Sequence, residues 1–383
     1  MGEFNRLRLG IVFNVSQKWM GGVIYILNAI RILKFLDDKD KPAVIVFYNP
    51  RLKKYVDEID YPYLELVPWN FDSVYRGFIL SIIKQKNLFI DDMVRKLDLD
   101  AVFPMHNFPV KSKLNAKLVA WTADLQHKYY PRFFSRRKRF ERNLRIKSIL
   151  KNTRDYVVSS QAVKDDFYRF FKIPQQVRFH IYHFASIIYD LPDIDFETIR
   201  SKYELPKEYF MISNQFHKHK NHLVAFKALA ELKRKNKKVH FAITGRFPDE
   251  PDSPYMHELH NIIADEKLMS NISLLGLIPR GDQLLLMKYA QAILQPSLFE
   301  GWSTVIEDAK SLQVPVIASS LPVNIEQLQE KGTYFEPHDH LKLAGILESY
   351  PKRDFNTKIY EDYEVRMKET AYELLEIFAS NNN

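Results

Sequence analysis

The stretch from Gln295 to Ala309, QPSLFEGWSTVIEDA, combines acidic residues with the start of a helix. It begins as the end of a buried strand, turns, and enters a segment with helical spacing that Ser303 or Thr304 is expected to cap. A helix start presents free N–H groups and a positive dipole end, which suit a phosphate. Glu300 and the acidic pair at 307–308 then lie close to an anion site, where carboxylates are expected to bind neutral hydroxyls. A sugar and a ribose beside a phosphate indicate a nucleotide sugar.

The same stretch is also compatible with an ordinary strand–turn–helix unit whose acidic residues are solvated. A second group therefore matters, in the loop after the strand expected over Tyr209–Ser213. Lys218 and Lys220 stand there beside a helix start, and a charge-assisted hydrogen bond to a phosphate contributes roughly 1.5–3 kcal/mol. The loop also holds three histidines at His217, His219 and His222. Their spacing would suit zinc, but solvated loop histidines are commoner, so we predict a phosphate clamp and no metal.

The N-terminal half carries two further groups at strand ends. Gly21 and Gly22 follow the first strand and open the first helix, where glycine lets backbone amides approach a diphosphate closely. His127 ends a run that begins at Thr122, and it is the candidate for the residue that faces the reacting sugar, through its ring or its backbone carbonyl. His106, at a neighbouring strand end, is the rival. Either histidine could instead be packed and hydrogen-bonded in the interior.

The elements that would position these groups alternate short apolar runs with helical segments. Uncharged runs such as Leu9–Phe13 are typical of parallel strands covered on both faces, and Val23–Leu36 and Phe78–Leu97 show helical spacing. The alternation stops in a charge-rich stretch at 187–207, which predicts a linker, and then restarts. Two doubly wound α/β domains facing a cleft follow, with ligands at the carboxyl ends of the strands.

The predicted domain boundaries follow from this pattern. Residues 1–188 form an N-terminal domain and residues 189–352 a C-terminal domain. Residues 353–383 contain one long closing helix, expected over Asp354–Ala379.

Composition limits the class of protein. A chain of 383 residues with 46% apolar residues is globular and long enough for two cores. It has no cysteine and no apolar stretch of about 18 residues, which fits a cytoplasmic protein. Three Asp-x-Asp pairs read as turn residues and not as metal ligands. They are Asp38/Asp40, Asp98/Asp100 and Asp193/Asp195.

The net charge of +9 favours anionic partners. Much of it lies in Arg132–Lys147, where eight basic residues accompany one acid. Phe133, Phe134 and Phe140 add apolar surface, and no known nucleic-acid module accompanies the patch, so an anionic membrane surface is favoured over nucleic acid. The expected location is cytoplasmic, or peripheral at the inner face of the membrane.

The segment from Glu300 to Asp308 resembles the E-x7-E signature of retaining GT-B glycosyltransferases of family 4. Glu300 matches the first acid, while the second position holds Asp308 in place of Glu and has Glu307 beside it. The loop Asn214–His222 resembles another motif of the family, in which an Arg precedes a Lys. Here Lys220 matches the Lys and Gln215 stands where the Arg is usual. Lys218 or Arg246 is therefore expected to supply the missing charge.

This resemblance, which extends over most of the chain, implies a fold and an activity. The fold would be GT-B: two Rossmann-like domains, the first for the acceptor and the second for the donor, with a C-terminal helix that crosses back to the first. The activity would be metal-independent transfer, with retention, of a sugar from a UDP- or GDP-sugar to a glycan or lipid-linked acceptor. The setting would be surface polysaccharide biosynthesis, and no cofactor would be required.

The resemblance also implies roles for residues. The catalytic residues would be His127, Lys220, which neutralises the leaving diphosphate, and Glu300, which holds a sugar hydroxyl. Leu277 and Ile278 would line the base, and Asp308 or Glu307 would hold the ribose. The donor-binding residues would be Gly21, Gly22, Gln215, Lys218, Gly245, Arg246, Leu277, Ile278, Gly301, Trp302, Ser303, Thr304, Glu307 and Asp308.

Three other classes stay open at this point. A GT-B nucleotide-sugar epimerase would share the fold. A nucleotide-sugar-binding protein without activity would account for the two motif positions that depart from the pattern. A nucleic-acid-binding protein would use the basic segment at 132–147.

Overall fold

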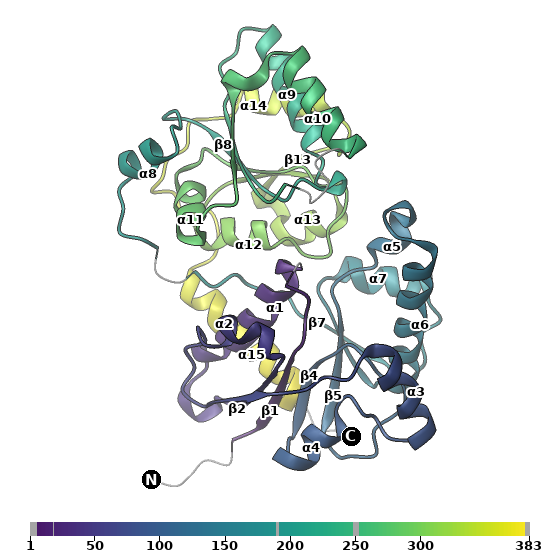
Figure 1. Ribbon diagram of the computed structural model, residues 1–383. Coiled ribbons are helices and arrows are strands. Elements are labelled where there is room, and N and C mark those ends of the chain that lie inside the picture. Colours follow the sequence, from purple (N-terminus) through teal and green to yellow (C-terminus); the bar gives the residue numbers. More distant parts are fainter. Residues whose placement is uncertain (1–5, 18, 189–190, 248–252, 380–383) are drawn as a thin grey trace. The chain divides into compact units, whose positions relative to one another are not determined.

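The structure is a computed structural model that describes residues 6–17, 19–188, 191–247 and 253–379. The chain divides into two compact units. The first unit consists of residues 1–187 and 362–383, and the second of residues 188–361. Each contains a parallel sheet between layers of helices (Figure 1).

The first unit has a sheet of seven strands in the order β3-β2-β1-β4-β5-β6-β7, and each neighbouring pair is parallel. The strands are β1 (Arg8–Phe13), β2 (Ala43–Tyr48), β3 (Leu64–Pro68), β4 (Ala101–Met105), β5 (Lys117–Thr122), β6 (Asp155–Val158) and β7 (Arg178–Ile181). The helices are α1 (Met20–Arg31), α2 (Lys53–Val56), α3 (Val74–Lys84), α4 (Asp91–Leu97), α5 (Gln126–Tyr129), α6 (Arg136–Asn152), α7 (Gln161–Phe170) and α15 (Tyr363–Ala379). Short 3₁₀ helices are η1 (Ile32–Phe35), η2 (Asp38–Asp40), η3 (Pro50–Leu52) and η4 (Pro131–Phe133).

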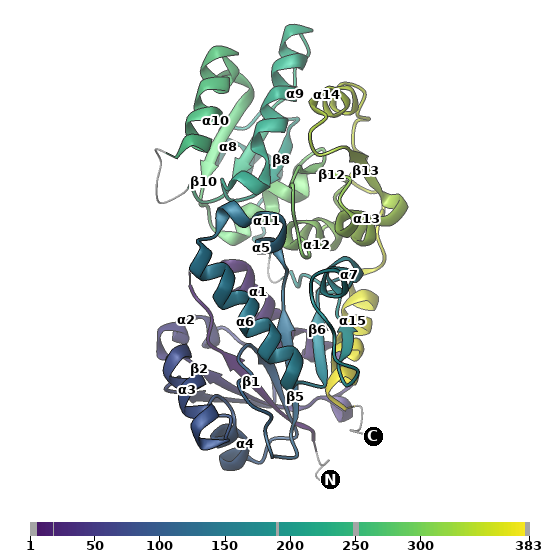
Figure 2. The ribbon, with the colours of Figure 1, turned by 90° about the vertical axis from the view of Figure 1, so that its right-hand side faces the viewer.

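Alternating side chains of the strands bury the two faces of this sheet in different layers. Val102 packs into a core cluster that includes residues of α4, α6 and α7. Its neighbour Phe103 points the other way and contacts Phe378 of α15, with ring centroids 5.6 Å apart. Lys368 adds an ion pair from α15 to Asp37 at 2.9 Å. The closing helix therefore returns to the first unit, where Figure 2 shows it in yellow.

The second unit has a sheet of six parallel strands in the order β10-β9-β8-β11-β12-β13. The strands are β8 (Phe210–Ser213), β9 (Phe241–Thr244), β10 (Ile272–Gly276), β11 (Ile293–Gln295), β12 (Val316–Ser319) and β13 (Gly332–Phe335). The helices are α8 (Phe196–Lys202), α9 (His222–Arg234), α10 (Pro254–Asp265), α11 (Arg280–Tyr289), α12 (Thr304–Ser311), α13 (Pro322–Leu328) and α14 (His340–Glu348). The 3₁₀ helices are η5 (Lys218–Lys220), η6 (Leu268–Asn271) and η7 (Gln329–Lys331).

In the second unit, too, alternating side chains of the strands pack into separate core clusters on the two faces of the sheet. Ile243 of β9 packs with residues of α9, α10 and α14. Ala242, one residue earlier, packs with residues of α8, α11 and α12 on the opposite face. Both faces of the sheet are thus covered, as the continuous apolar runs of the sequence predict.

Three strands escaped prediction, and all three lie at sheet edges. These are β3, β7 and β13. An edge strand has a neighbour on one side only, and these three are largely half-exposed. Their sequences therefore lack the continuous apolar run by which the central strands are recognised.

Three predicted segments need correction. The helix expected over Phe78–Leu97 is two helices, because Gln85 adopts a left-handed conformation with φ of 48° and ends α3. The expected linker contains α8, whose Ile199 is fully buried against the second unit's core. The single helix expected over Asp354–Ala379 begins only at Tyr363.

The boundary between the second unit and the closing helix also differs from the prediction. The prediction placed residues 353–361 with the closing helix, whereas they belong to the second unit. Arg353 donates to the carbonyls of Lys288 and Ala290, both at 2.7 Å. Tyr360 is buried in a core cluster of the second unit. The chain leaves that unit at 361, nine residues later than predicted.

No helix in the described part of the chain is both long enough and apolar enough to cross a membrane.

Candidate functional site

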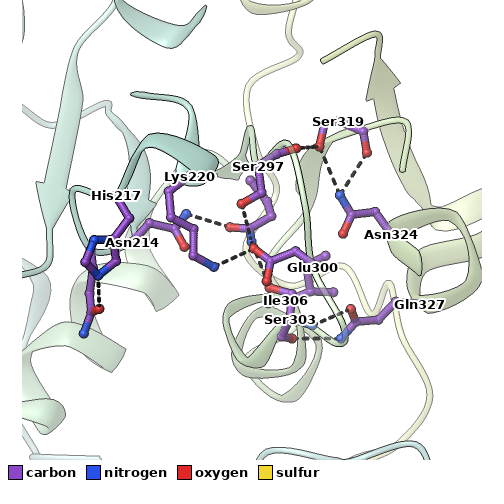
Figure 3. A network of polar contacts seen from close by, with 12 residues as sticks. Asn214, His217, Lys220, Ser297, Glu300, Ser303, Ile306, Ser319, Asn324 and Gln327 are labelled. Carbon is purple, nitrogen blue, oxygen red and sulfur yellow. Dashed lines mark hydrogen bonds and ion pairs between the residues drawn. The ribbon is translucent and has the colours of Figure 1, made fainter. Parts of the chain in front are cut away.

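Polar residues join the loops that follow β8 and β11, where the winding of the second sheet reverses. Asn214 donates to Gln295 Oε1 at 2.8 Å, and Gln295 Nε2 donates to Glu300 Oε1 at 2.8 Å. Lys220 Nζ lies 2.6 Å from the same Glu300 oxygen. Figure 3 shows the side chain of Lys220 directed at Glu300. Ligands of doubly wound folds bind at such a switch point, so this is the candidate site of the second unit.

Gln295 is the centre of this network, and the sequence analysis assigned it no role. Its side chain is completely buried, and it also donates to Ser303 Oγ at 3.0 Å. A buried amide must find partners, because an unpaired one costs about 1–3 kcal/mol. The available signal was a polar residue at the end of an otherwise apolar strand.

The start of α12 confirms one of the two predicted caps. Ser303 Oγ accepts from Ile306 N at 3.3 Å, so Ser303 and not Thr304 is the N-cap. Gln327 on α13 fixes the same turn, accepting from Ser303 N at 3.2 Å and donating to Ser303 O at 2.9 Å. Both contacts appear in Figure 3. Gly301 and Trp302 lie in the turn before the cap.

The two adjacent acids of α12 point in different directions. Glu307 accepts from Gln327 of α13 at 2.8 Å and pairs with Lys310 at 3.2 Å. Asp308 pairs with Arg280 of α11 at 2.5 Å. Arg280 follows directly on the segment with Leu277 and Ile278, so Asp308 and not Glu307 lies next to the predicted base-binding segment.

The loops after β9 and β10 come close to the loop after β8. Gly245 has a φ of +145° and donates its N–H to Gly276 O at 2.9 Å. An alanine Cβ at Gly245 would lie 2.1 Å from Asn214 O, so only glycine fits between these loops. Arg246 is exposed. Leu277 is 66% exposed, whereas Ile278 packs on the core.

The predicted donor-site residues in the loop after β8 lie in different surroundings. Lys220 reaches Glu300, whereas Lys218 is exposed. Gln215 accepts a contact from His217 Nε2 at 3.0 Å. His222 is fully buried and stacks on Phe216, with ring centroids 4.3 Å apart.

The histidines of this loop were also weighed as zinc ligands. Among residues 6–17, 19–188, 191–247 and 253–379, no three acidic or histidine side chains gather as a metal-binding group.

Buried histidines are expected to make the folded protein less stable in acid. Burial, with nearby Lys220, lowers the pKa of His222 and of His219 to about 3 each. The unfolded chain has ordinary histidines near pH 6.5, so below that pH it binds protons that the folded chain does not. The free energy of unfolding should therefore be fully present above pH 6.5 and fall as the pH drops toward 3.

Thermal unfolding measured from pH 8 to pH 4 tests this. His222→Gln should make the decline of the melting temperature at acid pH shallower, because one buried neutral histidine is removed. His260→Gln, at an exposed position of α10, is the matched control and should follow the unaltered protein. Equal slopes for both variants would contradict the prediction.

In the first unit the two glycines open the first helix, as predicted. α1 begins at Met20, so Gly21 and Gly22 form its first turn. A Cβ at Gly22 would lie 2.4 Å from the ring of Trp19, which shows that this glycine makes room for the tryptophan. Trp19 in turn stacks on Trp121 of β5 at 5.7 Å. Contact of these glycines with a phosphate stays a prediction.

His127 is placed differently from its predicted role. It lies in α5 with a side chain only 2% exposed, and its Nε2 contacts Asn143 Oδ1 at 3.1 Å. Burial lowers its pKa to about 4, so the ring is neutral near pH 7. The ring is thus packed against α6, and contact of His127 with the reacting sugar, through its ring or its backbone carbonyl, stays a prediction.

The rival histidine lines a cavity. A cavity of about 510 Å³ opens at the carboxyl ends of β1, β4 and β5, where the winding of the first sheet reverses. His106 and Asn107 line it from the end of β4, and Trp121 from β5. His127 is not among its lining residues.

Part of the chain matches a known family. Residues 195–373 match the family model described as "Glycosyl transferases group 1". The matched segment contains the loop after β8, the turn before α12 and both acids of that helix. It also includes the first part of α15.

Solved structures resemble the whole chain. HepE from Anabaena, solved with UDP-glucose, is 14% identical over 98% of this chain and 98% of its own, with a TM-score of 0.67. A glycosyltransferase from Rickettsia africae is 17% identical over 98% and 96%, with a TM-score of 0.61. Sucrose-phosphate synthase from Thermosynechococcus elongatus is 14% identical over 97% and 95%, with a TM-score of 0.60.

These likenesses define a class of fold. Two Rossmann-like units, with parallel sheets of seven and six strands, make this a protein of the GT-B fold. At such low identity the structural likeness shows the fold alone. Within that fold, the segment with the candidate site of the second unit is the part similar to group 1 glycosyl transferases.

Proposed function

We propose that this protein is a glycosyltransferase that moves a sugar, with retention at the anomeric carbon, from a nucleotide-diphosphate donor to an acceptor hydroxyl. The observation that carries the proposal is the contact of Lys220 with Glu300 at a strand switch point, beside the capped start of α12. A cation and a carboxylate placed together there can serve a diphosphate and a sugar hydroxyl of one ligand.

The proposed transfer breaks one bond of the donor and forms one bond to the acceptor, and Lys220 stabilises the leaving group. The bond between the anomeric carbon and the diphosphate oxygen breaks, and the acceptor oxygen forms the new bond on the same face. The acceptor proton goes to the departing diphosphate. Lys220 stabilises the negative charge that develops there, a role for which fixed cations are effective. With this lysine in place the proposed reaction requires no metal and no other cofactor, as in the sequence prediction.

Three finer points extend the proposal. The UDP-glucose complex of HepE favours a UDP-sugar, with a GDP-sugar as the alternative. The acceptor would be a glycan or a lipid-linked sugar, and the hexosyl transfer would serve surface polysaccharide synthesis. The protein would work in the cytoplasm, at the inner face of the membrane.

A panel of nucleotide sugars tests the activity. Thermal stabilisation by one nucleoside diphosphate, together with slow donor hydrolysis that persists in EDTA, would support the enzyme. Binding without any turnover, even with acceptor extracts, would point to an inactive binding protein. Formation of an epimeric nucleotide sugar would point to an epimerase. DNA binding without an effect of any nucleotide sugar would overturn the proposal.

The ribose contact has a specific test. Asp308→Asn should raise the KM for the donor about tenfold or more, since a hydrogen bond to a charged group contributes roughly 1.5–3 kcal/mol. Glu307→Gln should leave the donor KM nearly unchanged and lower the melting temperature instead, because Glu307 bonds to Gln327 and Lys310 inside the unit. Steady-state kinetics that show the opposite pattern would assign the ribose to Glu307.

A surface of the first unit supports the peripheral location. One face of α3 exposes Tyr75, Ile79, Ile82 and Ile83, each more than half exposed. α6 adds Phe140, 68% exposed, amid the basic residues of Arg132–Lys147. Arg137 Nη2 donates to Tyr75 OH at 2.8 Å and so links α6 to α3. Figure 2 shows these two helices on one side of the first unit. Apolar side chains bordered by basic ones suit an anionic bilayer.

Vesicle flotation tests this surface. The protein should float with vesicles that contain phosphatidylglycerol and stay behind with pure phosphatidylcholine. The double variant Ile83→Ser with Phe140→Ser should lose about tenfold or more in binding, since burying each such side chain contributes roughly 1.5–3 kcal/mol. Met269→Ser, which removes a 65% exposed apolar side chain from the second unit, is the matched control. Equal flotation of all variants would reject the surface.

A further inference from the structure

The cavity of the first unit carries chemistry that the donor site does not use. The family model covers residues 195–373, so none of the cavity's lining residues falls in it. The cavity lies at the strand switch of its sheet, the usual place for a ligand in this kind of fold. About 510 Å³ is room for one or two sugar rings or a small phosphorylated molecule.

The wall of the cavity contains a cation that forms no ion pair with another described residue. α6 contributes Arg142, Arg145, Ile146 and Ile149 to the lining, all on one helical face. Arg142 pairs with Asp124 at 3.5 Å. Arg145, one turn further along, makes no ion pair or hydrogen bond within the part of the chain that the structure describes. A half-buried guanidinium in that position is stabilised if an anion comes to it.

The acidic residues of the lining do not cancel this charge. Asp124 is already engaged by Arg142 and by the N–H of Gln126 at 2.9 Å. Asp72, the other acid of the lining, is exposed. Glu141, one turn earlier on α6, interacts electrostatically with Arg145 but is itself bound by Arg137 at 2.7 Å and by Tyr75. Among the described residues, Arg145 therefore has no ion pair of its own in the inner wall.

Three polar atoms of other residues that line the same cavity also have no partner among the described residues. Trp121 Nε1, His106 Nε2 and Asn107 Oδ1 are buried and form no hydrogen bond within the described residues. All three residues line the cavity. Trp121 is held rigidly, stacked on Tyr25 at 4.1 Å and on Trp19 at 5.7 Å. Trp19, which is 43% exposed, offers aromatic surface beside these polar groups, a combination that suits a sugar ring.

From this arrangement we infer that the cavity binds a phosphorylated sugar, with the phosphate on Arg145 and the ring beside Trp19 and Trp121. This rests on the proposed function, for which the cavity would be the acceptor site, and it narrows the acceptor to one that carries a phosphate. Two sources share that chemistry: a soluble sugar phosphate, and a polyprenyl-phosphate-linked sugar at a membrane. A neutral glycan would leave the charge of Arg145 without a partner.

Tryptophan fluorescence of the full-length protein reports on the cavity, because two of the four tryptophans line it. Glucose 1-phosphate should change the emission in a saturable manner, and methyl α-glucoside at equal concentration should not. Arg145→Gln should weaken this binding about tenfold or more, the effect of losing one charge-assisted hydrogen bond, and Arg145→Lys should restore part of it. Lys151→Gln changes an exposed residue of the same helix and should bind like the unaltered protein.

Further measurements separate the possible outcomes. Saturation by glucose 1-phosphate supports a soluble acceptor, whereas saturation only by a polyprenyl phosphate in detergent supports the lipid-linked one. Equal binding by Arg145→Gln, or equal binding of methyl α-glucoside, would overturn the inference. Donor hydrolysis without acceptor is measured on the unaltered protein and on Lys151→Gln, in which it should not change. If the unaltered protein hydrolyses no sugar donor, the proposed function is rejected. If it hydrolyses a donor but binds no phosphorylated sugar in preference to a neutral one, only the inference about the cavity is rejected.

Discussion

Replacing Lys220 by alanine is expected to lower the turnover of the sugar donor by about 10²-fold or more, the scale of one preorganised electrostatic contact. Lys220 is the cation within reach of Glu300, at 2.6 Å, and its side chain is 19% exposed. A charge so placed needs little rearrangement to meet a diphosphate. Lys218, two residues earlier, is exposed and does not share this position.

The variant also changes the resting site, and controls must separate the two effects. Without Lys220, the 10% exposed carboxylate of Glu300 keeps its bond from Gln295, and the protein should lose about 1–3 kcal/mol of stability. Lys220→Ala combined with Glu300→Gln should recover part of that stability and none of the turnover. Lys227→Ala, at an exposed lysine of α9, should leave both unchanged.

Donor turnover and thermal unfolding of these three variants decide the matter. Turnover that stays within a few-fold of the unaltered protein in Lys220→Ala would remove this lysine from the mechanism. A loss of turnover that follows the loss of stability, and is repaired together with it in the double variant, would make the pair structural.

Gly245→Ala is expected to destabilise the second unit by about 3 kcal/mol or more. The residue has a φ of +145°, and its new Cβ would lie 2.1 Å from Asn214 O and 2.5 Å from Asn214 C. These are backbone atoms and cannot rotate away. The melting temperature should fall by roughly 6–12 °C for a unit of this size.

The same substitution should weaken donor binding, because the displaced residue belongs to the site. Asn214 donates to Gln295, which in turn donates to Glu300. Movement of the loop after β8 therefore disturbs the carboxylate that is proposed to hold the sugar. Isothermal titration with the donor nucleotide at low temperature, where the variant is folded, measures this second effect.

Gly345→Ala is a control that should raise stability, whereas Gly245→Ala should lower it. This glycine lies in the exposed face of α14, and nothing lies within 4 Å of an added Cβ. Alanine there should raise stability by about 0.5–1 kcal/mol, because glycine is a poor residue inside a helix. If Gly245→Ala melts within 1–2 °C of the unaltered protein, the close approach of the three loops is not as the structure has it.

Much of the fold was predictable because its central strands are covered on both faces. The strands predicted over Leu9–Phe13 and Tyr209–Ser213 are β1 and β8, and each starts within one residue of the prediction and ends at the predicted residue. The edge strands β3, β7 and β13 were not predictable in this way, since pairing on one side only relaxes the demand for apolar residues. The start of α15 was missed because Arg353 and Tyr360 are held by contacts with distant residues and not by a local signal.

The sequence by itself determined where polar groups leave the strands. Parallel strands end at one edge of a sheet, so the loops that hold Lys220 and Glu300 were both predicted at strand ends, and the family resemblance assigned the two residues to one donor site. The cap of α12 was narrowed to two residues by chemistry alone. Periodicity accomplished this because it depends only on the backbone geometry of strands and helices.

The tertiary structure decided which neighbour each side chain meets. Consecutive residues of a helix point about 100° apart, so Glu307 and Asp308 meet different partners, and only packing shows that Asp308 meets Arg280. Packing likewise turned the ring of His127 into the interior and left His106 on a cavity. It also made Gln295 the centre of the Lys220–Glu300 network. Such choices depend on residues far apart in the chain, and local sequence spacing does not encode them.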